Sequence, residues 1–374
     1  MDLSKAFDTI NHELLISKLH AYGFDKSSLH LILSYLQDRK QRVKINTTFS
    51  PWVELGCGVP QGSVLGPMLF NIYLNDLFLF LSATDICNFA DDTTLFECNE
   101  NIEKVIQKLE SSSELVIIWF ENNFMKMNTE KCHLLVSGQK HEHLYTKVGE
   151  NIIWEKNEVK LLGLTIDNDL KCDTHISKIC SKANQKLSIL TRMKTFLSLK
   201  QRRIIFKSFF ESQFKYCPLI WMFCSRTANG KINKLHERAL RIVYDDLESS
   251  FEELLEKDNS FNIHHQNVQR VALEMYKILH GLSEGSFNEI LNDLKKNNHY
   301  NLRSASEFLV PSVNSEYKGK NSLRYFGPII WYSLNSDIKN IDTLSKFEEK
   351  IRKWKPDNCP CRLCKEFITC VGFL

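Results

Sequence analysis

The sequence contains no apolar run of the length that a membrane-spanning helix requires. Its longest apolar stretches, such as residues 115–120, are far shorter than the roughly 20 residues that cross a bilayer. It also lacks the charged segment followed by an apolar one with which a secretory leader begins. We therefore expect an intracellular protein, in the nucleus or the cytoplasm, with no membrane among its partners.

Regular cysteine spacing is also missing over most of the chain, and no repeat or low-complexity tract is visible. The twelve cysteines are scattered except near the C-terminus. Without a secretory signal, such cysteines are better interpreted as thiols than as disulfides.

What the sequence does contain is the composition of a globular protein. It has 374 residues, of which 43% are hydrophobic and 25% charged, with a formal net charge of +3. This length predicts two or three domains, each with room for a core.

Two adjacent carboxylates, Asp91 and Asp92, lie between the apolar residues 86–89 and the β-prone residues 93–96. This pattern predicts two short strands with the carboxylates at the tip of the hairpin, because Asp tolerates the backbone angles of tight turns. Neighbouring carboxylates repel each other unless a cation lies beside them, and their hard oxygens suit Mg²⁺ or Mn²⁺. The alternative is a solvated Asp-Asp turn.

The residues before this hairpin predict helices and a glycine-rich loop. Apolar residues recur every three or four positions on both sides of Gly23, which indicates two amphipathic helices. Residues 58–67 contain three glycines and two prolines and precede an apolar helix at residues 68–77. Glycine allows a backbone to approach a ligand closely, so this loop either contacts a nucleotide or is a rigid turn before a core helix.

Three blocks in this order carry a family resemblance: residues 2–8 (Asp-Leu-Ser-Lys-Ala-Phe-Asp), residues 58–67 (Gly-Val-Pro-Gln-Gly-Ser-Val-Leu-Gly-Pro) and residues 89–92 (Phe-Ala-Asp-Asp). Together they resemble the core motifs of the reverse transcriptase palm in jockey-like non-LTR retrotransposons. Residues 125–132 and 161–164 are similar to later motifs of that family. The resemblance implies an RNA-directed DNA polymerase that joins deoxynucleoside triphosphates to a DNA primer on an RNA template.

The resemblance also implies a catalytic site. Asp2, Asp91 and Asp92 match the carboxylates that hold two Mg²⁺ (or Mn²⁺) ions for nucleotidyl transfer, with Asp2 on the strand beside the hairpin. Phe7 matches the aromatic position that crowds the sugar 2′ position and so favours deoxynucleotides.

Further residues match substrate contacts of the family. Gln61 and Gly62 correspond to the loop that packs under the incoming nucleotide and the template base. Lys131 corresponds to a lysine that protonates the leaving pyrophosphate, although a solvated lysine before a strand is an equal alternative. Leu162 and Gly163 fall in the turn that grips the primer.

A basic segment follows this region. Residues 175–245 contain fifteen Lys and Arg against three acidic residues, an excess larger than the net charge of the whole chain. Lys178, Lys182 and Lys186 recur every four residues, opposite an apolar helical face. Such a segment is either a solvated face or, as we prefer behind a palm, a thumb that binds nucleic-acid phosphates.

We therefore predict an α+β right-hand polymerase fold. Residues 1–173 would form a palm without fingers, residues 174–245 a basic helical thumb, and residues 246–374 a helical C-terminal region with a Cys-rich tail. The acidic residues 246–258 would mark the boundary between the last two regions.

The sequence differs from the family pattern at its start. The fingers segment that precedes the first motif in the family is not present before Asp2. We interpret the chain as N-terminally truncated, which leaves its activity open. The alternative function is a catalytically inactive remnant that only binds nucleic acid.

The tail contains a cluster of four thiols, Cys359, Cys361, Cys364 and Cys370, which could hold Zn²⁺ tetrahedrally. Their spacing is not the usual pair of C-x₂-C motifs, so unliganded thiols are an equal alternative. If these residues bind zinc, purified protein should contain about one zinc ion per chain, and the double change Cys361→Ser, Cys364→Ser should remove it. Elemental analysis of protein prepared without chelators measures this, and zinc-free wild-type protein would favour the thiol tail.

Overall fold

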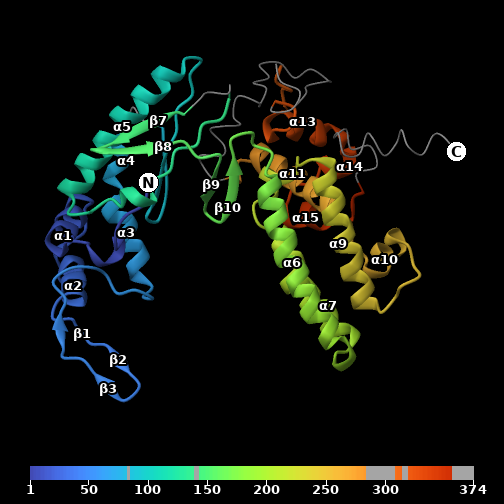
Figure 1. Ribbon diagram of the computed structural model, residues 1–374, viewed down its shortest axis with the longest axis horizontal. Helices are drawn as coiled ribbons and strands as arrows, with labels where there is room; N and C mark the ends of the chain where they lie inside the picture. The colour runs from blue at the N-terminus through green and yellow to red at the C-terminus, as the bar shows by residue number, and fades with distance from the viewer. Residues whose placement is uncertain (82–84, 139–142, 284–307, 314–318, 356–374) are drawn as a thin grey trace. The chain divides into compact units, whose positions relative to one another are not determined.

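The computed structural model describes residues 1–81, 85–138, 143–283, 308–313 and 319–355. Over these ranges the chain combines helices with short two-stranded sheets, which agrees with the expected α+β class. It divides into two compact units, Met1–Val159 and Lys160–Leu374, each of which is visible in Figure 1. No helix of the described residues is long and apolar enough to cross a membrane.

The first unit has helices at its N-terminal end and hairpins between and after them. Its helical elements are η1 (Ala6–Asp8), α1 (His12–Ala21), α2 (Lys26–Leu36), α3 (Leu65–Leu74), α4 (Asp76–Phe80), α5 (Ile102–Asn122) and η2 (Thr129–Lys131). Its strands are β1 (Lys40–Gln41), β2 (Lys44–Ile45), β3 (Thr48–Phe49), β4 (Val53–Glu54), β5 (Ile86–Phe89), β6 (Asp92–Leu95), β7 (Tyr145–Val148) and β8 (Asn151–Trp154). The pairs are β1 with β4, β2 with β3, β5 with β6 and β7 with β8, all antiparallel.

The two amphipathic helices predicted around Gly23 are confirmed as α1 and α2. Leu15, Leu19 and Leu36 are fully buried and join the core of the first unit with side chains from α3 and α5. Gly23 has a φ of +90°, a backbone angle that residues with a side chain rarely adopt, so glycine suits the connection.

The single apolar helix predicted at residues 68–77 is instead two helices. α3 ends at Leu74 and α4 begins at Asp76, and Asn75 lies between them with its N–H directed at the Ile72 carbonyl, 3.4 Å away. This bond spans three residues rather than four, which tightens the backbone and separates the helices.

A buried lysine joins the helices of this unit. Lys18 of α1 donates to the Tyr73 carbonyl (2.8 Å) and to Asp76 Oδ1 (2.7 Å), and its ammonium lies 4.7 Å from the ring centres of both Tyr73 and Trp119. Burial lowers the pKa of Lys18, while Asp76 opposes that change. Two acceptors and two aromatic faces offset the cost of burying this ammonium.

The second unit is mostly helical. A two-stranded sheet, β9 (Glu158–Leu161) with β10 (Leu164–Asp167), leads into it. Its helical elements are α6 (Asp173–Met193), η3 (Lys194–Phe196), α7 (Leu199–Ile205), η4 (Phe206–Phe210), η5 (Glu211–Phe214), α8 (Pro218–Trp221), α9 (Arg226–Tyr244), α10 (Phe251–Asp258), α11 (Ile263–Leu279), α13 (Leu323–Ser333), α14 (Ser336–Lys339) and α15 (Leu344–Lys353).

Two hydrophobic clusters organise these helices. The first lies between α6, α9 and the segment η4–η5, and the long helices α6 and α9 run side by side in Figure 1. The second joins α11, α13 and α15. The apolar face predicted for residues 176–190 is confirmed, since it is buried in the first cluster through these residues: Ile176, Ile179, Ala183, Leu187 and Leu190.

The acidic stretch at residues 246–258, which we interpreted as a boundary, contains a packed helix. α10 contacts α9, and its last residue, Asp258, accepts from Arg203 Nε (3.1 Å) and from the Tyr244 hydroxyl (2.8 Å). Later in the chain, α11, α13, α14 and α15 give the described part of residues 246–374 the helical character that we expected.

The first cluster contains a histidine with no hydrogen bond. His236 of α9 is fully buried, and neither of its ring nitrogens has a partner among the described residues. Its ring lies 5.8 Å from Phe206, 6.1 Å from Phe210 and 5.5 Å from Phe251, measured between ring centres. Burial lowers the pKa of His236 to about 4, against a weaker opposing effect of Asp258. The neutral imidazole therefore fills an aromatic site.

This histidine should make the fold sensitive to acid. Its pKa is lower in the folded chain than the ordinary 6.5, so the unfolded chain binds more protons between pH 6.5 and about 4, and stability is lost as the pH falls through that window. From pH 7 to pH 5 the loss due to His236 should be about 2 kcal/mol. Urea unfolding at both pH values should show a smaller pH dependence in His236→Phe. The exposed-site control His20→Leu should behave as wild type, and an unchanged dependence in His236→Phe would refute this account.

Candidate active site

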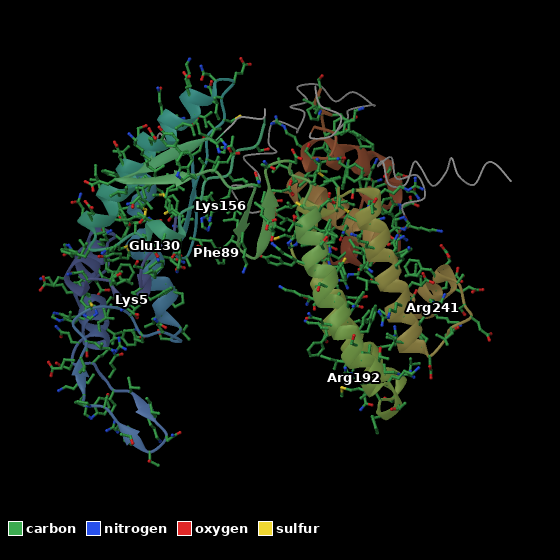
Figure 2. The ribbon with its side chains drawn as sticks, viewed as in Figure 1. Lys5, Phe89, Glu130, Lys156, Arg192 and Arg241 are labelled. Atoms are coloured by element: carbon green, nitrogen blue, oxygen red, sulfur yellow. The ribbon has the colours of Figure 1, made fainter. Side chains whose placement is uncertain are left out.

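The first four residues of the chain lie between two other segments of the first unit. On one side the Met1 ammonium donates to the Thr93 carbonyl (2.6 Å) and the Thr93 N–H donates to the Met1 carbonyl (3.1 Å). On the other side the Ser4 N–H donates to Lys126 O (2.8 Å) and an Asn128 N–H donates to the Asp2 carbonyl (2.9 Å). Figure 2 labels Lys5, Phe89 and Glu130, which belong to the three segments that meet here.

This backbone pairing places Asp2 beside the hairpin of Asp91 and Asp92. Met1 and Thr93 exchange both of their hydrogen bonds, which is the pattern of an antiparallel pair. In an antiparallel pair, the residue after Met1 lies opposite the residue before Thr93. Asp2 therefore lies opposite Asp92, and their side chains are on the same face.

The hairpin differs in detail from the sequence expectation. Phe89 pairs with Asp92, so the loop consists of Ala90 and Asp91, and Asp92 is the first residue of β6. The residue with the left-handed backbone is Ala90, with a φ of +52°, and not an aspartate. For a residue with a Cβ this conformation costs roughly 1–2 kcal/mol, so the turn that presents Asp91 is strained.

Lys131 lies among the three carboxylates. Its ammonium is 2.9 Å from Asp2 Oδ2, an oxygen that is buried and has no donor aligned on it as a hydrogen bond. The Asp2 carboxylate raises the pKa of Lys131, and Asp91 and Asp92 add smaller effects in the same direction. The lysine is therefore protonated at neutral pH, and its positive charge occupies the place where these carboxylates favour a cation.

The donor set has the right chemistry for a hard divalent ion, because all three groups are carboxylates and one buried oxygen lacks an aligned donor. They do not yet form a closed cage: within the ranges that the structure describes, no three His, Cys, Asp or Glu side chains gather closely enough to hold a metal. The expected three-carboxylate cage is thus open: Asp2 comes from the N-terminal segment, and Asp91 and Asp92 come from the β5–β6 hairpin.

The glycine-rich loop packs against the segment that follows Asp2. The Val59 N–H donates to the Phe7 carbonyl (2.9 Å), and Gln61 Nε2 donates to Asp8 Oδ1 (2.9 Å). A Cβ on Gly58 would lie 2.9 Å from the Asp8 backbone, so glycine is needed for this close approach. Gly62 is exposed and has a φ of +77°. No atom lies within 4 Å of the position that a Cβ would take there, so there is open space above the loop.

Two residues of this region were not predicted from the sequence. Asp8 fixes the Gln61 side chain, and His12 Nε2 lies 2.8 Å from the Gly58 carbonyl. Asp8 is the last residue of the first motif, so the sequence could have indicated that it belongs to the site. Nothing in the sequence connects His12 with residue 58. The Phe7 ring stacks on Phe70 of α3, 4.5 Å between ring centres.

The remaining predicted residues belong to the second unit. Leu162 and Gly163 form the turn between β9 and β10, with φ values of +47° and +87°, and the Tyr216 hydroxyl donates to the Leu162 carbonyl. On α6 the Lys178 ammonium lies 3.3 Å from Thr165 Oγ1.

The other two predicted lysines lie further along α6. Lys182 is exposed, and Lys186 lies 5.5 Å from the centre of the Phe209 ring. The tail cysteines, Cys359, Cys361, Cys364 and Cys370, lie outside the described residues.

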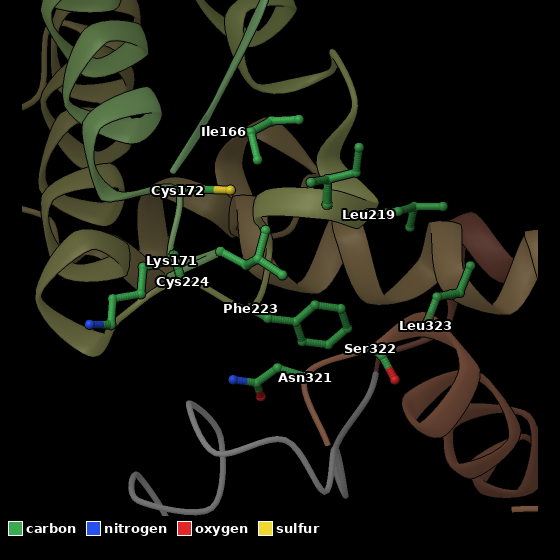
Figure 3. A pocket seen from close by; sticks show the side chains of 11 residues that line it. Ile166, Lys171, Cys172, Leu219, Phe223, Cys224, Asn321, Ser322 and Leu323 are labelled. Atoms are coloured by element: carbon green, nitrogen blue, oxygen red, sulfur yellow. The ribbon is translucent and has the colours of Figure 1, made fainter. Parts of the chain in front are cut away.

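The second unit also has a cavity of about 270 Å³ that contains none of the predicted site residues. Figure 3 shows Cys172, Cys224, Phe223 and Leu323 in its lining. Burial raises the pKa of Cys172 to about 11 and that of Cys224 to about 12, so both remain unreactive thiols.

Comparison with known families gives a match over the first unit and the β9–β10 hairpin that follows it. Residues 1–166 match the family described as "Reverse transcriptase (RNA-dependent DNA polymerase)". The matched region contains the three carboxylates, Lys131, the glycine-rich loop and the turn at residues 162–163.

Similar curated proteins come from insect mobile elements. A "Probable RNA-directed DNA polymerase from transposon BS" of Drosophila melanogaster is 26% identical over 259 residues, 66% of this chain and 28% of the relative. The "RNA-directed DNA polymerase from mobile element jockey" of the same species is 26% identical over 255 residues, 65% of this chain and 28% of the relative. A "Retrovirus-related Pol polyprotein from type-1 retrotransposable element R2" of Popillia japonica is 28% identical over 221 residues, 51% of this chain and 36% of the relative. The chain thus spans about a third or less of these relatives.

If Lys131 occupies a cation site, its removal should strengthen metal binding. In Lys131→Met no ammonium competes for Asp2, so the affinity for Mn²⁺ should rise several-fold over wild type. The double change Asp91→Asn, Asp92→Asn should abolish this binding. Titration of Mn²⁺ followed by electron paramagnetic resonance measures the free ion. Lys126→Met, an exposed lysine on the neighbouring segment, is the control, and equal affinity in both lysine variants would contradict the assignment.

Proposed function

Since residues 1–166 are a reverse transcriptase domain of the jockey-like kind, we propose that this chain carries out RNA-directed DNA synthesis. Its substrates would be an RNA template, a DNA primer and deoxynucleoside triphosphates. The observation that carries the proposal is the convergence of Asp2 and the Asp91–Asp92 hairpin around Lys131 within the matched domain.

In this proposal Asp2, Asp91 and Asp92 hold Mg²⁺ or Mn²⁺. Two such ions, when bound, would activate the primer 3′-hydroxyl and stabilise the leaving pyrophosphate. The backbone pairing of Met1 with Thr93 fixes the distance between Asp2 and the hairpin. Asp2 Oδ2 would exchange the Lys131 ammonium for the stronger field of a divalent ion.

Lys131 would then serve as the general acid. Its pKa is raised while it faces the carboxylates, so it carries its proton when substrate arrives. If a divalent ion were held at Asp2, it would displace the Lys131 ammonium, which could then donate its proton to the leaving pyrophosphate.

The glycine-rich loop and Phe7 would form the nucleotide site. Gln61 is held by Asp8, and Gly62 leaves open space above the loop for the nucleotide and the template base. The Phe7 ring, stacked on Phe70, is rigid enough to crowd the sugar 2′ position and exclude ribonucleotides.

We propose that the second unit supplies the contacts with the primer-template. Leu162 and Gly163, fixed by Tyr216, would form the primer grip, and Lys178, Lys182 and Lys186 of α6 would contact phosphates. Palm, thumb and C-terminal region would comprise residues 1–173, 174–245 and 246–374. The contact-based division after Val159 differs from this palm limit, because the β9–β10 turn packs with the helices that follow it.

Primer extension tests the proposal directly. On an RNA template with Mg²⁺, wild-type chain should make a DNA product, and Asp91→Ala, Asp92→Ala should reduce the rate at least a hundredfold, because the charge developing in the transition state loses its stabilising ions. Asp25→Ala, an exposed helix cap, is the matched control and should retain the product. Salt-dependent RNA binding without extension by any of the three proteins would favour a binding remnant instead.

A further inference from the structure

Residues 40–54 form a ribbon that has no core. Every residue in this range is exposed, although β1 pairs with β4 and β2 with β3. In Figure 1 the ribbon extends beyond α2, away from the other helices of the first unit. A two-stranded ribbon without a buried face is only marginally stable in water, so the ribbon is available to contact a ligand.

A bulge bends the ribbon in its middle. Between the two paired regions, one strand contributes residues 42–43 and the other residues 50–52. The Ser50 N–H donates to the Val43 carbonyl (2.9 Å), and Pro51, which has no N–H, occupies the unpaired position. Bulges of this kind increase the local twist and redirect the side chains beside them.

The bulge brings two cations over two aromatic rings. The Arg42 guanidinium carbon lies 4.0 Å from the ring centre of Phe49 and 4.4 Å from that of Trp52, and the Lys44 ammonium lies 5.2 Å from Phe49. The rings remain open to solvent, since Phe49 is 45% and Trp52 is 58% exposed. Cations and flat apolar surfaces thus share one face of the ribbon.

The ribbon is also positively charged. Four basic residues, Arg39, Lys40, Arg42 and Lys44, stand against a single carboxylate, Glu54, which pairs with Lys40 at 2.9 Å. Among the described residues no carboxylate forms an ion pair with either cation over the rings. A polyanion with exposed flat groups is the ligand that complements this surface in charge and shape.

We propose that residues 39–54 bind single-stranded RNA, with unpaired bases stacked on Trp52 and Phe49 and phosphates bound by Arg42 and Lys44. Stacking on aromatic rings beside basic side chains is how proteins bind single strands, and in a duplex the base faces are already covered. The choice of RNA rests on the proposed function, whose template is an RNA strand. The contact is additional to the catalytic carboxylates and to the lysines of α6.

Binding of a short labelled oligouridine to the full chain, measured by fluorescence anisotropy, tests this. Phe49→Ala, Trp52→Ala should weaken binding roughly tenfold, because the stacking surfaces are lost. Arg42→Glu, Lys44→Glu should weaken it further and lower the slope of log affinity against log salt by about 1.4, which corresponds to two phosphate contacts. The matched control Lys26→Glu, Lys104→Glu makes the same charge change on α2 and α5 and should keep the affinity within about twofold of wild type.

The same assay separates this proposal from the proposed polymerase function. Lys178→Glu, Lys182→Glu, Lys186→Glu should weaken binding of an RNA–DNA duplex, which the ribbon variants should bind as wild type does. If both ribbon variants bound oligouridine with wild-type affinity, the ribbon proposal would be overturned. The proposed phosphate contacts of the α6 lysines would not be affected by that result. If the ribbon variants lost affinity for oligothymidine but not for oligouridine, the ribbon would be assigned to DNA. That result would also overturn the RNA proposal. The proposal would also be overturned if the wild-type chain were a dimer that the ribbon substitutions converted to a monomer without changing the affinity for RNA.

Discussion

The candidate site depends on the backbone pairing of the first four residues. Met1 exchanges two hydrogen bonds with Thr93, while Ser4 and the Asp2 carbonyl bond to the segment of Lys126 and Asn128. These bonds join the segment of Asp2 to both of its neighbouring segments. With them, a carboxylate from the start of the chain lies beside two carboxylates from far along the sequence. The chemistry of the site is therefore a consequence of strand pairing.

The protein surrounds three of its cations in contrasting ways. Lys18 is buried and is retained by a carbonyl, a carboxylate and two aromatic faces, so it fixes the helices around it. Lys131 is exposed and its neighbours are carboxylates, so it is the cation for which we propose replacement by a divalent ion. Arg42 follows a third pattern, with aromatic faces but no carboxylate, which leaves its charge for a ligand. Burial and the nature of the partners separate a structural cation from a functional one.

Motif order and periodicity predicted helices in both units. The helices around Gly23 and the apolar face of α6 follow from the spacing of leucine, isoleucine and alanine, which decides what can be buried together. Local pattern failed at Asn75, where one apolar run became two helices, and at Ala90, where the hairpin forces strain on a residue without turn preference. Residues 246–258 show in addition that an acidic stretch can bury an aspartate when an arginine and a tyrosine from other helices contact it.

The sequence by itself determined the family resemblance, the choice of candidate carboxylates and the positions of the main helices, because these depend on residue types and on spacing along the chain. Only the tertiary structure decided that Lys131 lies among Asp2, Asp91 and Asp92, that Asp8 fixes Gln61, and that Arg42 lies over Phe49 and Trp52. Each of these contacts joins segments whose approach is set by packing and backbone pairing elsewhere. A local sequence pattern does not show which segments come into contact, since the same residues at the same spacing can face solvent or each other.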